Sequence, residues 1–262
     1  SNAPASTTTT LTTSLDTLTG TQYADTFKAL YDYSTSSATT SSTISTGDKI
    51  TAGLGTDSIE IAISGTVDGG SVPIPAADIT GIEKWYLRNT TSEVTNGTDY
   101  ISMDASLYPG VTEVWNDRST ATINVSNLPT GAVFGIKGNG TTTMNDSSDF
   151  NMKTATDALT LTLDGGIVGG ANTDITNTGS PTTATITSKG AALNTTAGTI
   201  NVVDVVSLAS GNNTVTSLTI NATSGITFGT SSSAAITGMA ADSSITITGA
   251  GDVTLATVDA DV

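Results

Sequence analysis

The stretches SLTINATSGITF (residues 217–228) and SITITGAGDVTL (residues 244–255) align without a gap at an offset of 27 residues. In each stretch, apolar residues alternate with Thr, Ser or Asn on both sides of a turn that contains glycine. The matched apolar residues are Leu218 with Ile245, Ile220 with Ile247, Ile226 with Val253 and Phe228 with Leu255. A strand-turn-strand unit that cannot bury a face alone is typical of stacked repeats. The pair therefore predicts a β-solenoid or an elongated β-sandwich.

The same period of two recurs along the chain. SIEIAIS (58–64) places three isoleucines on one face, and ALTLTL (158–163) does the same with three leucines. KWYLR (84–88) puts Trp85 and Leu87 opposite Lys84, Tyr86 and Arg88. Alternation with β-branched Thr on the outward face is typical of half-buried strands. We expect an all-β, elongated fold with Gly/Thr/Asp-rich turns, and one helix over residues 24–33, where Phe27, Leu30 and Tyr31 have helical spacing.

The composition changes near residue 155. Beyond Phe150 the only aromatic residue is Phe228, and beyond Lys153 the only basic residue is Lys189. The opening SNA is typical of an expression-tag remnant. We therefore divide the chain into a tag remnant and linker (1–10), an aromatic-bearing β region with candidate calcium turns (11–155) and a repetitive β region rich in Thr, Ala, Gly and Val (156–262).

Charge and composition restrict the function. The chain has 24 acidic and 8 basic residues, a formal net charge of −16, which disfavours binding to nucleic acid because phosphates would be repelled. Cys and His are absent, which excludes thiol chemistry and triads that need either residue. No apolar run approaches the roughly 20 residues that span a bilayer, so we expect a chain that does not cross a membrane.

Two pairs of aspartates share a nine-residue spacing: Asp16 with Asp25, and Asp48 with Asp57. An apolar residue follows each aspartate two positions later. AGLGTDSIE (52–60) departs only at Ala52 from the calcium-binding nonapeptide, in which Gly makes the turn, Asp binds the ion and the apolar residue enters the core. The spacing predicts calcium ligands at Asp16, Asp25, Asp48 and Asp57. The alternative is that these carboxylates accept hydrogen bonds from turn backbone and need no ion.

A catalytic site has weaker support. Asp104, Glu113 and Asp117 surround Trp115 in the manner of a glycosidase carboxylate pair beside an aromatic platform. The simpler interpretation is a core Trp with Glu113 and Arg118 as a surface ion pair. We expect no enzymatic activity.

The order of several blocks resembles that of bacterial surface-layer proteins that also carry calcium-binding repeats of the RTX type. These blocks are LDTLTGTQYADTFKA, GDKITAGLGTDSIEI, ITGIEKWYLRN, SMDASLYPGVTEVWNDRSTATINVSNLPTGAVFGIKGNG and the two repeats quoted first. The resemblance implies type I export, an extracellular location on the bacterial cell surface and calcium-dependent self-association into a lattice, with cell-surface polysaccharide as a further partner. It places Asp16, Asp25, Asp48 and Asp57 on the calcium-associated blocks.

Two other classes of function stay open. The first is a cell-surface adhesin or glycan-binding β-solenoid, which would expose Trp85, Tyr86, Tyr108 and Trp115 along a groove. The second is a β-helical polysaccharide lyase or hydrolase, for which only Lys84, Arg88 and Arg118 could supply the basic group. Burial of the four rings would favour the structural function.

Overall fold

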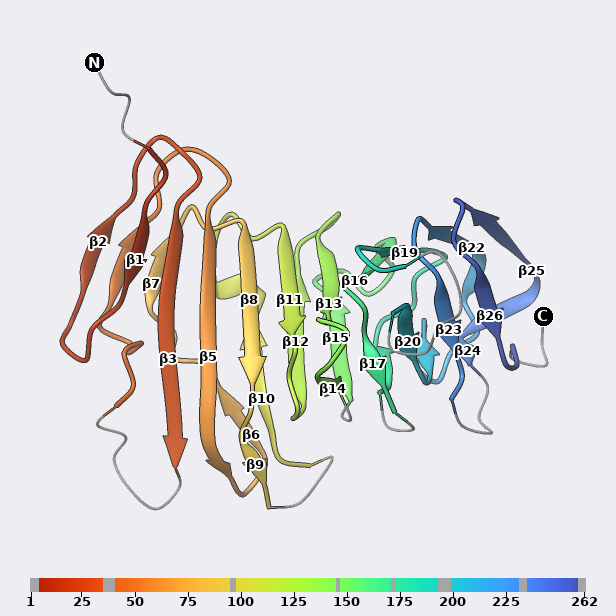
Figure 1. Cartoon of the computed structure of the whole chain (residues 1–262), viewed down its shortest axis with the longest axis horizontal. Coiled ribbons are helices and arrows are strands. Elements are labelled where there is room, and N and C mark those ends of the chain that lie inside the picture. The colour runs from red at the N-terminus through yellow and green to blue at the C-terminus, as the bar shows by residue number, and fades with distance from the viewer. Residues whose placement is uncertain are drawn as a thin grey trace.

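The chain winds into a parallel β-solenoid in which every strand pair of the described residues is parallel. The computed structural model describes residues 5–34, 41–94, 98–144, 147–170, 173–192, 199–230 and 235–258. Figure 1 shows the strands standing side by side along the long axis of the molecule, from the N-terminal end to the C-terminal end. The prediction of an all-β, elongated fold is confirmed, and parallel pairing makes it a solenoid.

One 11-stranded sheet, here called sheet A, runs the length of the molecule. Ten of its strands follow one another in chain order, one for each coil of the chain, and we call each coil a rung. The exception is β9, which lies off this path and pairs with the end of β5. The strands are β1 (Thr8–Thr10), β3 (Thr26–Ser34), β5 (Ser58–Val67), β8 (Lys84–Asn89), β9 (Ser92–Glu93), β11 (Glu113–Asp117), β13 (Val133–Lys137), β16 (Leu159–Asp164), β19 (Thr183–Lys189), β22 (Val215–Ala222) and β25 (Met239–Thr248).

Four further sheets complete the rungs. Sheet B contains β2 (Thr17–Thr19), β4 (Lys49–Thr51) and β7 (Asp78–Thr80), and a two-stranded sheet pairs β14 (Thr143–Met144) with β17 (Val168–Gly169). Sheet C contains β6 (Ser71–Pro73), β10 (Tyr100–Asp104), β12 (Ile123–Leu128), β15 (Ser148–Met152), β18 (Ile175–Asn177), β21 (Val206–Ser207) and β24 (Ile236–Thr237). Sheet E contains β20 (Asn201–Val203), β23 (Ile226–Phe228) and β26 (Val253–Leu255), and the 3₁₀ helix η1 (Ala105–Leu107) follows β10.

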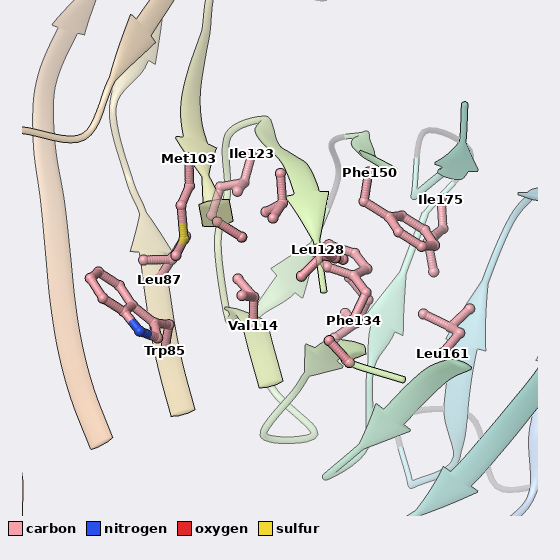
Figure 2. Packing of buried hydrophobic residues seen from close by; sticks show 14 of the residues in the cluster. Trp85, Leu87, Met103, Val114, Ile123, Leu128, Phe134, Phe150, Leu161 and Ile175 are labelled. Carbon is pink, nitrogen blue, oxygen red and sulfur yellow. The ribbon is translucent and has the colours of Figure 1, made fainter. Parts of the chain in front are cut away.

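The core lies between sheets A and C and is filled by stacked apolar side chains. Figure 2 shows Trp85, Val114 and Phe134 of sheet A facing Met103 and Phe150 of sheet C. The rings of Phe134 and Phe150 stack at 4.4 Å between centroids. Because neighbouring rungs keep their register, each inward residue contacts its counterparts on the rungs before and after it.

The 27-residue repeat corresponds to one rung. Leu218 pairs with Ile245 and Ile220 with Ile247 in sheet A, while Ile226 pairs with Val253 and Phe228 with Leu255 in sheet E. The repeat alignment therefore gives the observed register from Ser217 onward, and the one register shift between β22 and β25 lies before it, between Val215 and Ser217.

The helix expected over residues 24–33 is wrong, because this segment forms strand β3. All nine residues of β3 pair in register with β5, from Thr26 with Ser58 to Ser34 with Thr66. Phe27 and Ala29 are buried while Lys28 is exposed, which is the alternation of a strand. Pairing along β5 outweighs the helical spacing of three apolar residues, two of which have aromatic side chains that favour strands.

The change of composition at residue 155 does not interrupt the sheets. Phe134 of β13 pairs with Leu161 of β16, so sheet A continues from the aromatic-bearing region into the repetitive region. Thr8–Thr10, which we assigned to the linker, form β1 and pair with Thr26–Lys28. Within the part of the chain that the structure describes, there is no helix long and apolar enough to cross a membrane.

Candidate functional site

The four predicted aspartates lie in two columns at corners of the first rungs. Asp16 and Asp48 precede β2 and β4, which pair in sheet B, while Asp25 and Asp57 precede β3 and β5, which pair in sheet A. The nine-residue spacing is thus the distance along one rung from sheet B to sheet A. Asp16 and Asp48 are brought together, as are Asp25 and Asp57.

In the sheet A column, each carboxylate accepts the backbone N–H of the equivalent residue on the preceding rung. The Asp25 N–H donates to Asp57 Oδ1 at 2.6 Å, and the Asp57 N–H donates to Glu83 Oε2 at 2.7 Å. Asp25 Oδ1 in turn accepts from the Thr7 N–H at 2.6 Å, and its Oδ2 accepts from the Thr21 N–H at 2.5 Å. These bonds satisfy donors at a corner where the sheet pattern is interrupted.

The sheet B column repeats this arrangement. The Asp16 N–H donates to Asp48 Oδ1 at 2.9 Å, and the Ser45 N–H donates to Asp48 Oδ2 at 2.6 Å. Asp16 Oδ2 accepts from the Thr12 N–H at 2.7 Å. The side chains of Asp16 and Asp48 are therefore used to hold their own turns and to join neighbouring rungs.

Asp57 differs from the other three aspartates. It is fully buried, and its Oδ2 has no hydrogen-bond partner among the described residues. Burial raises its pKa above the ordinary value, and the neighbouring carboxylates of Glu83 and Asp25 act in the same direction, against the hydrogen bond from the Asp25 N–H. For Asp25 burial also acts to raise the pKa, but the hydrogen bonds from Thr21 and Thr7 lower it to about 2.

The glycines of AGLGTDSIE allow the two corner loops to approach closely. Gly53 and Gly55 have φ of 101° and 122°, in the left-handed region. A Cβ on Gly53 would lie 2.1 Å from the Thr21 carbonyl oxygen, and one on Gly55 would lie 2.6 Å from the Tyr23 carbonyl carbon. Glycine is therefore required at these positions by the stacking of one loop on the other.

A calcium ion in proteins takes six to eight oxygen ligands. Among the described residues, no group of three or more acidic side chains is placed to hold a metal ion. Of the four predicted ligands, Asp57 is the one whose buried carboxylate oxygen lacks a donor and so fits a cation. Calcium ligation by these aspartates stays a prediction.

The aromatic side chains do not form an exposed platform. Trp85, Tyr108 and Trp115 are buried, and Tyr86 is half-buried. Trp85 packs in the core against Tyr108 at 4.2 Å between centroids, whereas Trp115 lies on the outer side of sheet A, stacked on Tyr86.

The carboxylates around Trp115 each have a separate partner. Glu113 accepts a hydrogen bond from Trp115 Nε1 at 2.8 Å and forms an ion pair with Lys84 at 3.0 Å. Arg118 pairs with Asp117 at 2.7 Å, so the predicted Glu113–Arg118 pair is wrong. Asp104 caps η1 by accepting from the Ser106 N–H.

Sequence analysis missed a set of buried asparagines at the ends of strands. Asn201 accepts from the N–H groups of Gly166 and Ile167 and donates through Nδ2 to carbonyl oxygens of Leu163 and Lys189. Asn89 and Asn177 likewise donate to backbone carbonyls on a neighbouring rung. For Asn89 and Asn177 the available signal was an Asn at the end of a strand segment followed by a turn, whereas Asn201 is the first residue of β20.

Comparison of the chain with protein-family models, with curated proteins and with solved structures gave no match.

Proposed function

We propose that the chain is a structural, non-enzymatic segment of a bacterial surface-layer protein that self-assembles into a calcium-dependent extracellular lattice. The observation that carries this proposal is the single parallel solenoid, in which sheet A is unbroken from β1 to β25. A solenoid is stiff along its axis and presents long, regular outer faces. Such faces suit contacts that propagate between copies in a plane.

Burial of the aromatic rings favours this function over glycan binding by the same rings. Three of the four rings that would form a sugar platform are inaccessible. In the solenoid they instead fill the core or support neighbouring side chains on sheet A.

A second candidate, a cell-surface adhesin or glycan-binding module, is favoured by a different surface. A hollow of about 340 Å³ lies on the outer side of sheet C and is lined by Tyr100, Asn124, Asp149 and Asn151, among other polar residues. An aromatic ring beside amide and carboxylate groups can contact both the apolar and the hydroxyl-bearing parts of a sugar.

Calcium enters the proposal at the sheet A corner. Asp57 offers a buried carboxylate oxygen without a donor, next to Asp25 and Glu83 in the same column. A cation there would compensate the charge of a buried carboxylate, which is otherwise costly.

The test is a thermal melt with light scattering in excess chelator, then in millimolar calcium, with magnesium as the ion control. The protein is compared with the variants Asp48→Ala/Asp57→Ala and Asp78→Ala, the latter removing an exposed carboxylate outside both columns. We expect a calcium-specific rise in melting temperature and in scattering that only the double variant loses. Absence of calcium-dependent assembly would contradict the proposal.

A further inference from the structure

The positive charge of this acidic chain is collected on one surface. Six of its eight basic residues lie on the outer side of sheet A or directly after one of its strands, and we call this surface the basic face: Lys28, Lys84, Arg88, Arg118, Lys137 and Lys189. The other two, Lys49 and Lys153, belong to sheet B and to the turn after β15. Glu60, Glu113 and Asp117 lie on the same face, each in an ion pair with one of these basic residues. Most of the 24 acidic residues lie elsewhere, so the remaining surface is strongly acidic.

The basic face contains a small hollow. Its volume is about 180 Å³, and its lining includes three basic residues, two acidic residues and Tyr86: Lys28, Arg88, Arg118, Glu60, Asp117 and Tyr86. Ala62 of β5 pairs with Arg88 of β8, so the short alanine side chain leaves space beside the longer arginine. The hollow has the size of a single side chain or small group rather than of a cofactor.

Arg88 is the basic group in this hollow that lacks a counter-ion. Lys28 forms an ion pair with Glu60 at 3.2 Å, and Arg118 donates two hydrogen bonds to Asp117 at 2.8 and 2.7 Å. Arg88 is exposed and makes no ion pair or hydrogen bond with any residue that the structure describes. Its planar guanidinium leaves five donors free, in a geometry that matches a carboxylate.

The walls of the hollow are held in place. Tyr86 stacks on Trp115 at 6.1 Å between centroids, and the Lys137 ammonium lies 5.0 Å from the centre of the Tyr86 ring. Arg118 has a φ of 55°, unusual for a residue other than glycine, and its N–H donates to the Lys137 carbonyl at 2.9 Å. A group entering the hollow would meet side chains that need little reordering.

We infer that this hollow binds a carboxylate on the acidic surface of a second copy of this chain, with Arg88 as the main contact. The inference rests on the proposed self-association and names one of its contacts. Charge complementarity at Arg88 carries it, since this guanidinium is free whereas the carboxylates on the same face are paired with other basic residues, and the rest of the surface is acidic. Charges further apart than about 8 Å are screened at physiological ionic strength, so local attraction at Arg88 acts despite the net charge of both copies.

The contact is heterologous, because it joins two different surfaces of the same chain. Such contacts propagate instead of closing into a symmetric dimer. Among the described residues, three exposed aspartates whose side chains have no partner are available as the carboxylate donor: Asp68, Asp242 and Asp252. Asp68 stands beside Gly69 and Gly70, where an added Cβ would meet nothing within 4 Å.

The test compares sedimentation and light scattering of the wild type, Arg88→Glu and the control Lys153→Glu, which changes charge equally at an exposed position outside the basic face. We expect Arg88→Glu to lower self-association at least tenfold and Lys153→Glu to leave it unchanged. Because Arg88→Glu keeps its acidic surface, it should still bind wild-type chains and, in excess, stop their growth. Combining Arg88→Glu with Asp68→Lys, Asp242→Lys or Asp252→Lys should restore assembly in one case and identify the donor.

The outcomes separate this inference from the proposed function. If the wild type assembles and Arg88→Glu assembles equally well, the inference is wrong and the proposed function stands. If the wild type does not assemble, the proposed function fails, and the peptide TVDGGS (66–71) with its Asp→Asn counterpart then probes the hollow alone. Binding that needs both the peptide carboxylate and Arg88 would support the hollow as a carboxylate site, and no binding would overturn it. Binding of an acidic oligosaccharide through Arg88, without self-association, would overturn the choice of partner.

Discussion

Asp25 and Asp57 lie on adjacent rungs, 32 residues apart, and the Asp25 N–H donates a hydrogen bond of 2.6 Å to Asp57 Oδ1. The pKa of Asp25 is nevertheless lowered, whereas the pKa of Asp57 is raised. Asp25 receives backbone donors on both oxygens, whereas Asp57 Oδ2 receives none from the described residues. Two aspartates in equivalent positions of the sequence motif therefore contribute differently to stability.

For Asp25, we expect Asp25→Asn to lower the free energy of unfolding by about 2 to 3 kcal/mol at neutral pH, because buried N–H groups lose a charged acceptor. The folded-state pKa of about 2 lies below the ordinary value of 3.8, so the ionised form is favoured by folding. This contribution is present above about pH 4 and is lost as the pH falls toward 2. Urea unfolding of the wild type and of Asp25→Asn from pH 2 to 7 measures this contribution. If the difference in the free energy of unfolding between the two proteins does not shrink at low pH, the carboxylate of Asp25 is not its source.

For Asp57, the raised pKa predicts a pH dependence of stability opposite to that of Asp25. The folded state favours the protonated form of Asp57. Its contribution to stability is therefore present below the ordinary pKa of 3.8 and is lost as the pH rises through the raised pKa of the folded state. In chelator at pH 7, Asp57→Asn should leave stability unchanged or raise it, by up to about 1 kcal/mol. In calcium the same variant should lose whatever stabilisation the ion gives, measured as the difference between melts with and without the metal. A loss of stability in chelator equal to that of Asp25→Asn would show that the two carboxylates are equivalent.

The nine-residue spacing could be recognised in the sequence, but its structural meaning could not. Spacing alone does not distinguish an ion ligand from an acceptor of backbone N–H groups, because both place Asp at a corner before a strand. The distinction depends on Thr21, in the turn just before Asp25, and on Thr7 and Glu83, which come from neighbouring rungs. Sequence patterns do not show which rungs become neighbours.

Asn201 is predicted to be among the most important polar residues for stability. It is fully buried, and its amide forms hydrogen bonds with backbone groups of two segments that precede it in the chain, including Gly166 and Lys189. Asn201→Ala should destabilise the fold by about 3 kcal/mol, since these buried groups lose their partners. Asn212→Ala, at an exposed asparagine, serves as the control and should change stability by less than about 0.5 kcal/mol. Equal effects in urea unfolding would exclude a special role for Asn201.

Gly135 and Trp115 form a tight contact on the basic face. A Cβ on Gly135 would lie 2.2 Å from Trp115 Cε3, so Gly135→Ala must displace the indole. We expect a loss of about 1 to 3 kcal/mol together with a change in tryptophan fluorescence. In the Trp115→Leu background the same glycine change should cost much less, and a double-mutant cycle measures that coupling. Additive effects of the two changes would mean that the indole does not limit position 135.

Most of the fold could be predicted from alternation, because inward residues such as Ile59, Leu161 and Ile220 follow a period of two. The prediction of a helix at residues 24–33 was wrong because the spacing of nearby residues carries no information on the partner strand β5. The choice between solenoid and sandwich also depended on strand direction, which alternation does not determine. The 27-residue repeat left this choice open, although its alignment matches the register of the paired strands in the structure.

Removal of one rung tests the solenoid most directly. Because Ser217 pairs with Ser244 and Ile226 with Val253, deletion of residues 217–243 should place the last rung where the previous one had been. Ile245 and Ile247 would then stack on Ala184 and Ile186, which Leu218 and Ile220 contact in the full chain. We expect a folded protein with the same circular dichroism signature and a modestly lower melting temperature, as for loss of one repeat from a linear array. Deletion of residues 217–229, which removes only part of a rung and brings β24 instead of β25 to the place of β22, should instead unfold the C-terminal rungs. Equal stability of the two deletions would show that rung register does not determine the fold of this region.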